Sequence, residues 1–461
     1  MARSSSIDLA RRAFMQRGAA LGMAGAAAPL ALNLSLIGEA SAAGSTGDYK
    51  ALVCVFLYGG NDYGNTLPPV DDVHHAQYAS IRGTVATSKA ALLDTALSPT
   101  VALPDGLRYA LAPELSPLLP LWNDGALAVQ LNVGPLIQPT TQAQYNARSV
   151  PLPPKLFSHN DQQSIWQSDL PEGASSGWGG RIGDLLLSGN GNAAFTCTSV
   201  TGNAVYLSGA QAIPYQIGTS GAVAINGASR ALYGSATAQA ALRSLVTATR
   251  SHPFENEYNR IVQRSIAAEG QITAALAGAP ALTTTFDSTN ALATQLKMVA
   301  RLIGARAALG TTRQVFLVSL SGFDLHDNLV DNHPGLLAKV GGALKSFHDA
   351  TVELGVAQQV TAFTASDFGR TLSINGDGSD HGWGSHHFVV GGAVKGQRYY
   401  GTAPAVAVNG PDDVGQGRLL PTTSVDQFAA TLATWMGVSA TDLPLVVPNI
   451  GNFTTRNLGF V

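Results

Sequence analysis

Five short runs of consecutive apolar residues recur along the chain. They cover residues 51–57, 127–131, 314–320, 359–364 and 388–390. Such runs are typical of strands buried on both faces of a sheet. Helical spacing of apolar residues is found at 162–167, 237–249, 255–276, 288–308, 335–354 and 424–436. Buried strands that alternate with helices predict an α/β fold, with a mostly parallel central sheet and helices on both of its faces.

Two segments have a different pattern and predict a small β-rich insertion. Residues 195–206 and 216–226 alternate Thr or Ser with apolar residues, and glycines interrupt the second segment. This alternation favours short antiparallel strands in an insertion or cap. The chain shows no internal repeat and no linker, so we expect residues 44–461 to form a single domain with insertions.

The first 43 residues have the pattern of a twin-arginine export signal. Arg11 and Arg12 precede an Ala-, Gly- and Leu-rich run over 18–37, and small residues follow at 40–42. A membrane helix is the alternative, but Gly, Ala and Pro dominate the run, which is poor material for a permanent span. We therefore expect the twin-arginine translocase to export the chain, so that the protein is periplasmic or secreted. No other stretch is long and apolar enough to span a membrane.

Composition narrows the function classes. A net charge of -3, with 12% charged residues and no Lys/Arg cluster, argues against a nucleic-acid partner. Two cysteines, Cys54 and Cys197, do not make a disulfide scaffold. A bridge between them stays open in an oxidising compartment, because the sequence does not supply the distance that it needs.

Polar, glycine-punctuated segments follow three of the predicted strands. In a parallel sheet the carboxyl ends of the strands meet at one edge, where ligands bind. Asp62, Asp324, His326, Asp367 and Arg370 should therefore share one rim. In extended backbone residues i and i+2 point the same way, so Asp324 and His326 can converge on one metal ion. Arg370 can hold a phosphate or sulfate group and stabilise negative charge.

Each of these residues also has a purely structural interpretation. Asp62 follows Gly-Gly-Asn and suits a turn. Asp324 and His326 can form a local hydrogen bond in a surface loop. Asp367 and Arg370 can pair with each other as a structural ion pair. Their shared position at the strand ends favours the functional interpretation.

Histidine is scarce in the chain but clustered in one segment. Ten histidines occur in 461 residues, and three of them, His381, His386 and His387, lie within seven positions after Asp380. Carboxylates and imidazoles are suitable ligands for a divalent metal, above all Zn and also Mn, Mg or Ca. Adjacent residues in a strand point to opposite faces, so only one of His386 and His387 should join the site. We favour His386.

The serine at position 158 is the candidate nucleophile. Ser158 precedes the predicted helix at 162–167, whose N-terminus could bind an anion and activate a hydroxyl. Ser158 as a helix N-cap, with Asp161 in the first turn, explains the same residues without catalysis.

Several motifs, in this order, resemble an uncharacterised family of exported proteins in the alkaline phosphatase and sulfatase superfamily. The motifs are the twin-arginine start, Phe56-Leu57-Tyr58-Gly59-Gly60-Asn61-Asp62, Ser158-His159, Gly177-Trp178-Gly179-Gly180-Arg181, Gly322-Phe323-Asp324-Leu325-His326, Ser366-Asp367-Phe368-Gly369-Arg370-Thr371 and Asp380-His381-Gly382 through Gly391-Gly392. The resemblance spans almost the whole chain and implies an alkaline phosphatase-like α/β fold.

The resemblance also implies roles for individual residues. Asp62 would be the first metal ligand, Asp324 and His326 the next, and Asp380, His381 and His386 the last. Asp367 lies where this superfamily places a further ligand, while Phe368 stands where a ligating histidine is expected. Ser158 is farther from Asp62 along the chain than the superfamily's nucleophile usually is.

The sequence leaves three hypotheses for the function of the protein. The leading hypothesis is an exported, metal-dependent hydrolase of small phosphate or sulfate esters. The alternative is an exported binding or structural protein that keeps the fold without turnover, and Phe368 supports it. A carbohydrate-active hydrolase that uses two carboxylates ranks behind both, because no acid and base pair stands out.

Overall fold

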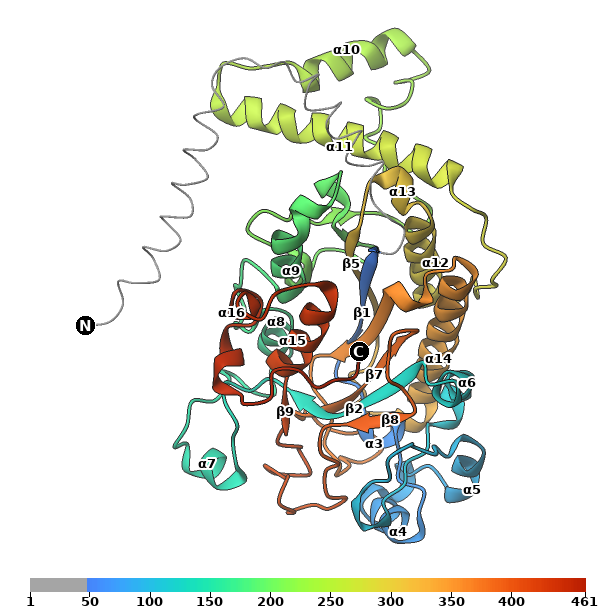
Figure 1. The fold of residues 1–461 in the computed structure, drawn as a ribbon, viewed down its shortest axis with the longest axis vertical. Helices are drawn as coiled ribbons and strands as arrows, with labels where there is room; N and C mark the ends of the chain where they lie inside the picture. The colour runs from blue at the N-terminus through green and yellow to red at the C-terminus, as the bar shows by residue number, and fades with distance from the viewer. Residues whose placement is uncertain (1–47) are drawn as a thin grey trace, which may run out of the picture. The chain divides into compact units, whose positions relative to one another are not determined.

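The first strand lies inside the central sheet and is buried on both faces. In the computed structural model, which describes residues 48–461, β1 (Lys50–Tyr58) pairs with β5 on one side and β6 on the other (Figure 1). Val53 and Val55 belong to one hydrophobic core, whereas Cys54 and Phe56 belong to the other. Side chains alternate across a strand, so a run without polar residues supplies both cores.

The sheet of the described region has nine strands and is mostly parallel. The other strands are β2 (Leu127–Gly134), β3 (Cys197–Ser199), β4 (Tyr215–Gln216), β5 (Arg313–Ser321), β6 (Val360–Ser366), β7 (Ser385–Gly391), β8 (Arg398–Tyr400) and β9 (Thr423–Ser424). Their order is β4-β3-β5-β1-β6-β7-β2-β8, and β9 also pairs with β2. Only β7 runs antiparallel to its neighbours, β6 and β2, among these strands. The predicted α/β fold with a mostly parallel sheet is confirmed.

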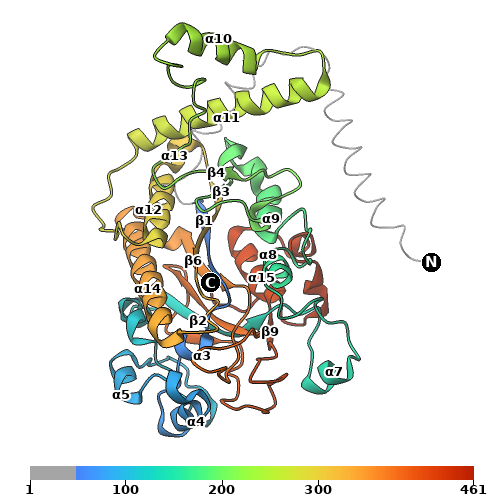
Figure 2. The same cartoon turned by 180° about the vertical axis from the view of Figure 1, so that it is seen from behind.

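Helices cover both faces of the sheet (Figures 1 and 2). α12 (Ala291–Gly304) and α14 (Leu329–Glu353) pack on one core, and α8 (His159–Ser168), α9 (Trp178–Leu186) and α15 (Val425–Met436) on the other. The other helices are α3 (Tyr63–Thr66), α4 (Asp72–Arg82), α5 (Lys89–Leu92), α6 (Leu119–Asn123), α7 (Gln142–Ala147), α10 (Ala236–Thr247), α11 (Pro253–Gly278), α13 (Arg306–Leu309) and α16 (Leu443–Val446).

The expected antiparallel strands of the insertion differ from those in the structure. β3 and β4 are short and join the edge of the central sheet in parallel, β3 against β5 and β4 against β3. The outer edge of β5 would otherwise expose unpaired backbone groups, and β3 covers it. Cys54 and Cys197 are both buried free thiols.

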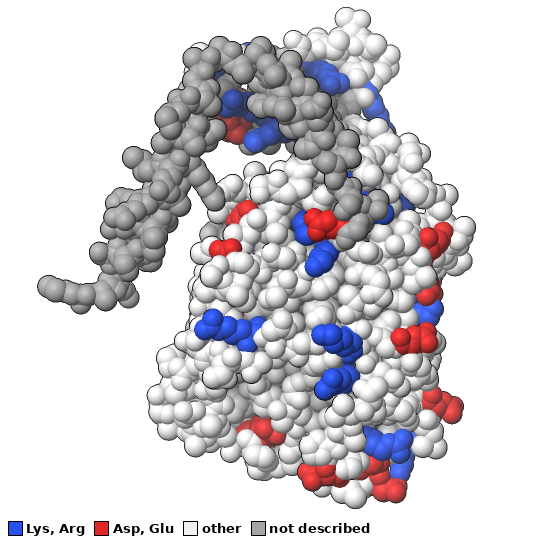
Figure 3. Space-filling view, viewed as in Figure 1, with Lys and Arg blue, Asp and Glu red and all other residues white. Residues whose placement is uncertain are grey.

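Two expectations concern the ends of the chain and its surface. The signal predicted over residues 1–43 lies outside the described residues. Within residues 48–461, no helix combines the length and the apolar character needed to cross a membrane. On the face seen in Figure 3, most residues are uncharged, and the charged side chains include both acidic and basic ones.

A pair of buried carboxyl groups joins the end of α8 to the start of α15. Asp169 accepts a hydrogen bond of 2.8 Å from Arg181, while Asp426 accepts one of 3.0 Å from Ser424. Burial, reinforced by the neighbouring Asp426, raises the pKa of Asp169. Burial also raises the pKa of Asp426 to about 6. The folded protein therefore holds a proton here that the unfolded chain releases.

We expect Asp426→Asn to change how stability depends on pH. The ordinary pKa of Asp is about 4, so between about pH 4 and pH 6 folded wild type binds more protons than the unfolded chain, and its stability falls as pH rises. The variant lacks this proton. The free energy of unfolding of the variant, relative to that of wild type, should therefore increase from about pH 4 to about pH 6. This relative increase should persist at higher pH. Urea unfolding at several pH values measures this, with exposed Asp72→Asn as control. Parallel curves for wild type and both variants would contradict the shared proton.

Candidate metal centre

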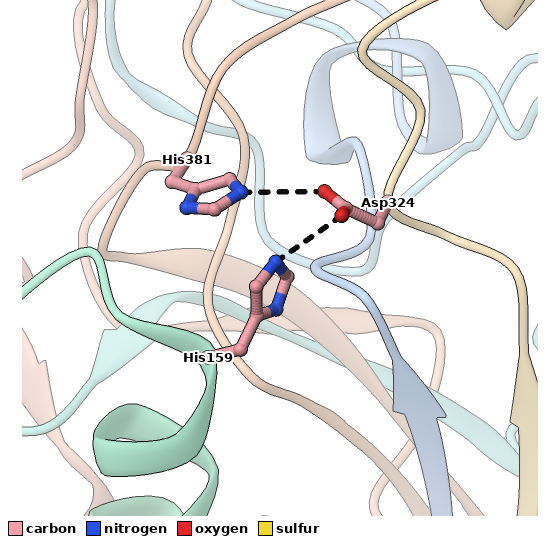
Figure 4. A group of neighbouring side chains, drawn as sticks. All are labelled: His159, Asp324 and His381. Atoms are coloured by element: carbon pink, nitrogen blue, oxygen red, sulfur yellow. Dashed lines mark ion pairs between the residues drawn. The ribbon is translucent and has the colours of Figure 1, made fainter.

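Three side chains from distant parts of the chain converge at the carboxyl ends of β1, β5 and β6. His159 is the first residue of α8, Asp324 follows β5, and His381 lies between β6 and β7 (Figure 4). Nε2 of His159 is 3.3 Å from Asp324 Oδ2, and Nε2 of His381 is 3.3 Å from Asp324 Oδ1. Ligand atoms of the three residues lie within 4.8 Å of one another, a spacing that can hold one metal ion.

The far nitrogen of each imidazole is held by an acceptor. Nδ1 of His159 is 2.7 Å from Oδ2 of Asp367, and Nδ1 of His381 is 2.8 Å from the carbonyl oxygen of Phe157. These oxygens accept a hydrogen bond from Nδ1–H, so in the neutral ring Nε2 keeps its lone pair and faces Asp324. Metal-binding histidines are oriented in this way. Nε2 of His159 is buried and makes no hydrogen bond with any described residue.

A third imidazole, that of His326, meets the same carboxylate. Its Nε2 is 3.1 Å from Asp324 Oδ1 and 2.9 Å from Nε2 of His381, while its Nδ1 is 3.3 Å from Asp380 Oδ1. Two lone pairs at such a distance repel unless a proton or a cation lies between them. The structure therefore brings together the predicted residues Asp324, His326 and His381, with Asp380 behind His326. We call His159, Asp324, His326 and His381 the His-Asp cluster.

Asp367, a predicted ligand, lies behind His159. It is fully buried, and its Oδ1 accepts a 3.1 Å hydrogen bond from the backbone of Gly59. Its Oδ2 accepts from Gln163 at 2.6 Å as well as contacting His159. The hydrogen bond to Asp367 raises the pKa of His159, whereas burial lowers the pKa of His381. In this position Asp367 orients His159.

Arg370 pairs with Asp324, and the ion pair with Asp367 that we considered does not form. Its Nη1 donates to Asp324 Oδ1 at 2.6 Å and to the carbonyl of Gly59 at 3.1 Å, and its Nη2 donates to the carbonyl of Ser379. Arg370 is 1% exposed. Burial raises the pKa of Asp324, but Arg370 and the nearby histidines outweigh it and lower that pKa. Arg370 therefore keeps Asp324 ionised, and few of its own donors remain for a substrate.

Close packing under the His-Asp cluster explains two features of the motifs. A Cβ atom at Gly59, whose φ is 117°, would lie 2.3 Å from the backbone nitrogen of Asp324, so only glycine lets β1 approach this loop. The ring of Phe368 lies 4.8 Å from that of His159 and 4.7 Å from that of His381, measured between centroids. Phe368 thus supports the two imidazoles in place of the histidine that the resemblance led us to expect.

Two other predicted ligands lie outside the His-Asp cluster. Asp62 is buried, and Arg82 donates to its Oδ2 at 2.6 Å and the backbone of Asn65 to its Oδ1 at 3.0 Å. His386 packs its ring against Tyr63 in the core, and burial lowers its pKa to about 3. The structure gives Asp62 an ion-pairing and helix-capping role and His386 a core position.

Ser158 occupies the N-cap position of α8, directly before His159. Its hydroxyl donates to Asp161 Oδ2 at 3.0 Å and accepts no backbone hydrogen bond of the helix. The position matches the capping alternative, but the capping bond itself is absent, so the hydroxyl is held by a carboxylate beside the cluster.

His159 is the site residue that sequence reasoning missed. It belongs to the Ser158-His159 motif, but no other residue of the His-Asp cluster lies near it in the chain. Its partners Asp324 and His381 reach it only through the order of the strands in the sheet. The sequence offered one signal for His159, which is that it lies just before the predicted helix at 162–167.

The fold and this site define the chain as an α/β protein with a candidate histidine- and aspartate-based metal centre. A family model described as "Protein of unknown function (DUF1501)" matches residues 49–445. The chain belongs to this DUF1501 family. A search of curated proteins finds no match.

Several solved structures are similar at low sequence identity. One is described as Ps i-CgsB in complex with k-i-k-neocarrahexaose, with 10% identity, a TM-score of 0.34, and coverage of 88% of this chain and 76% of that one. Another is described as the lipoteichoic acid synthase LtaP from Listeria monocytogenes, with 8% identity, a TM-score of 0.33, and coverage of 91% and 81%.

Proposed function

We propose that this protein is a divalent-metal-dependent hydrolase of small phosphate or sulfate esters that acts outside the cytoplasm. The observation that carries the proposal is the convergence of three imidazoles on Asp324. All three Nε2 atoms lie within 3.3 Å of its carboxylate, and the Nδ1 atoms of His159 and His381 are hydrogen-bonded to oxygens. Export is proposed from the Arg11-Arg12 segment alone, through the twin-arginine translocase.

The donor set of the cluster fits zinc better than the harder cations. Imidazole nitrogens with one carboxylate are ligands that Zn²⁺ takes in a tetrahedral arrangement, whereas Mg²⁺ and Ca²⁺ prefer oxygen. The buried Nε2 of His159, which makes no hydrogen bond with any described residue, is a ligand atom that such an ion would satisfy. When bound, the ion would polarise the ester and lower the pKa of a coordinated water.

The chain's own residues would hold and orient this site. Asp367 and the carbonyl of Phe157 fix the rings of His159 and His381, and Arg370 keeps Asp324 charged. Ser158 remains the candidate nucleophile, because it precedes His159 at the start of a ten-residue helix. Asp324 is 44% exposed, so the site is open to a substrate.

Elemental analysis and zinc titration of the purified protein test the proposal. We expect one or more equivalents of a divalent metal to copurify, zinc to bind by calorimetry after chelation, and zinc to restore hydrolysis of aryl phosphates or aryl sulfates. Protein with only trace metal, and with no metal that restores activity on either ester class, would overturn the proposal.

A second candidate is a metal-binding protein without turnover. It is favoured by the fact that Arg370 already balances Asp324 and that Asp161 already holds the Ser158 hydroxyl. Zinc binding together with no hydrolysis of any ester in the panel would support this candidate over the enzyme.

A further inference from the structure

Arg418 touches both segments that carry the imidazoles. It lies between β8 and β9, and its Nε donates to the carbonyl oxygen of His381 at 2.8 Å. Its guanidinium lies 4.9 Å from the centroid of the Phe157 ring. Phe157 in turn orients His381 through its carbonyl and lies two residues before His159. Arg418 therefore contacts both His381 and the residue that orients its ring.

The charge of Arg418 has no carboxylate partner among residues 48–461. Its hydrogen bonds go to backbone carbonyls, those of His381 and of Gly415, the latter from Nη1 at 3.3 Å. No carboxylate oxygen of the described chain lies within salt-bridge distance of it, and Nη2 has no acceptor there. A half-buried guanidinium in this condition has part of its donor fork free for an anion.

The other cations near the site are already balanced. Arg370 pairs with Asp324 at 2.6 Å, and Lys155 lies 3.4 Å from Asp161. Arg370 had been our candidate for holding the substrate anion, but its burial and its three acceptors leave it little capacity. Arg418 is the guanidinium beside the cluster whose charge remains unpaired within the described residues.

We propose that Arg418, and not Arg370, recognises the anionic group of the substrate, a phosphoryl or sulfuryl oxygen presented to the His-Asp cluster. This inference rests on the proposed function, since it assigns the substrate's charged group to that same site. A bidentate hydrogen-bonded contact from a guanidinium favours a tetrahedral oxyanion over a neutral ester. Arg418 would therefore determine the substrate class.

A purely structural role for Arg418 predicts something different. Phe157 has a positive φ of 71°, a strained conformation for a side chain of its size. If Arg418 only held Phe157 in place, removing it would disturb the orientation of His381 and weaken metal binding as much as anion binding. Anion recognition predicts that metal binding persists and anion binding weakens.

Calorimetry with inorganic phosphate and with Zn²⁺ separates the two roles. The proteins are the full chain and its Arg418→Gln and Arg418→Lys variants, each titrated with phosphate in zinc-loaded and zinc-free form. Arg398→Gln is the matched control, because Arg398 also lies over an aromatic ring, that of Tyr400, at 5.6 Å. Circular dichroism and urea unfolding check that the variants fold.

For Arg418→Gln we expect the Kd for phosphate to rise about 10- to 100-fold, the loss typical of one charge-assisted contact, while zinc affinity stays within about twofold. Arg418→Lys should give an intermediate Kd, and Arg398→Gln should match wild type. An unchanged phosphate Kd in Arg418→Gln, or an equal loss of zinc affinity, would overturn the inference. Wild type that binds no divalent metal would overturn the proposed function. Phosphate binding that depends on Arg418 in that metal-free protein would still support this inference.

Discussion

Replacing Asp324 by alanine is expected to lower zinc affinity by at least about 100-fold and to reduce ester hydrolysis by about 1,000-fold or more. Its two oxygens contact His159, His326, His381 and Arg370. Without the carboxylate, the three imidazoles would lose the group that they share, and Arg370 would lose its acidic partner. The measurements are calorimetric zinc titration, metal content after purification, and turnover of the best ester in the panel.

The neighbouring acid Asp327 provides a matched control for this prediction. Asp327 is exposed and lies in the same loop, so Asp327→Ala removes a carboxylate without touching the His-Asp cluster. His159→Ala should follow Asp324→Ala, because it removes the buried Nε2 donor. Zinc content equal to wild type in folded Asp324→Ala protein would contradict the site.

The second large effect concerns the buried ion pair of Asp62 and Arg82. Arg82 is fully buried, and its Nη2 donates to Asp62 Oδ2 at 2.6 Å. Burial raises the pKa of Asp62, but Arg82 and its other hydrogen bonds outweigh this and lower it, so the carboxylate is charged. Arg82→Met would leave that charge buried with Ser379 and Asn65 as its partners. We expect the free energy of unfolding, measured by urea unfolding, to fall by about 3–5 kcal/mol.

A double variant distinguishes this ion pair from a metal site at Asp62. Arg82→Met with Asp62→Leu removes both charges and should be more stable than Arg82→Met alone, because no uncompensated charge stays buried. A metal ligand behaves differently, since Asp62→Leu by itself would then abolish zinc binding. Equal stability of the single and double variants, with zinc binding lost in both, would contradict the structural role.

The strands were predictable because each apolar run is long and uninterrupted. β1 and β5 match the predicted runs to within a residue or two at their ends. β7 was also expected as a strand, but its antiparallel direction depends on the loop that holds His381, and no local pattern encodes it. α14 begins at Leu329, before the predicted start, and it continues through Pro334, although a proline inside a helix removes one backbone hydrogen bond.

The candidate site was predictable only where its residues follow strands. Asp324, His326 and Arg370 gather at one rim as expected, since parallel strands end at the same edge. Asp62 follows the same rule, yet its partner Arg82 comes from α4, whose docking no spacing reveals. His386 shows the opposite limit, because its histidine-rich segment turns into β7 and carries that side chain into the core.

The proposed metal site depends on segments far apart in the sequence, so it would be complete only in the folded protein. His159 and Asp324 could be placed by the strands and helices around them, but the donor supplied by His381 reaches them only after β6 has joined β1 and the chain has turned back into β7. A nascent or truncated chain that stops short of this turn would lack one of the proposed ligands. The zinc content of a sample would therefore report the fraction of chains that have folded completely.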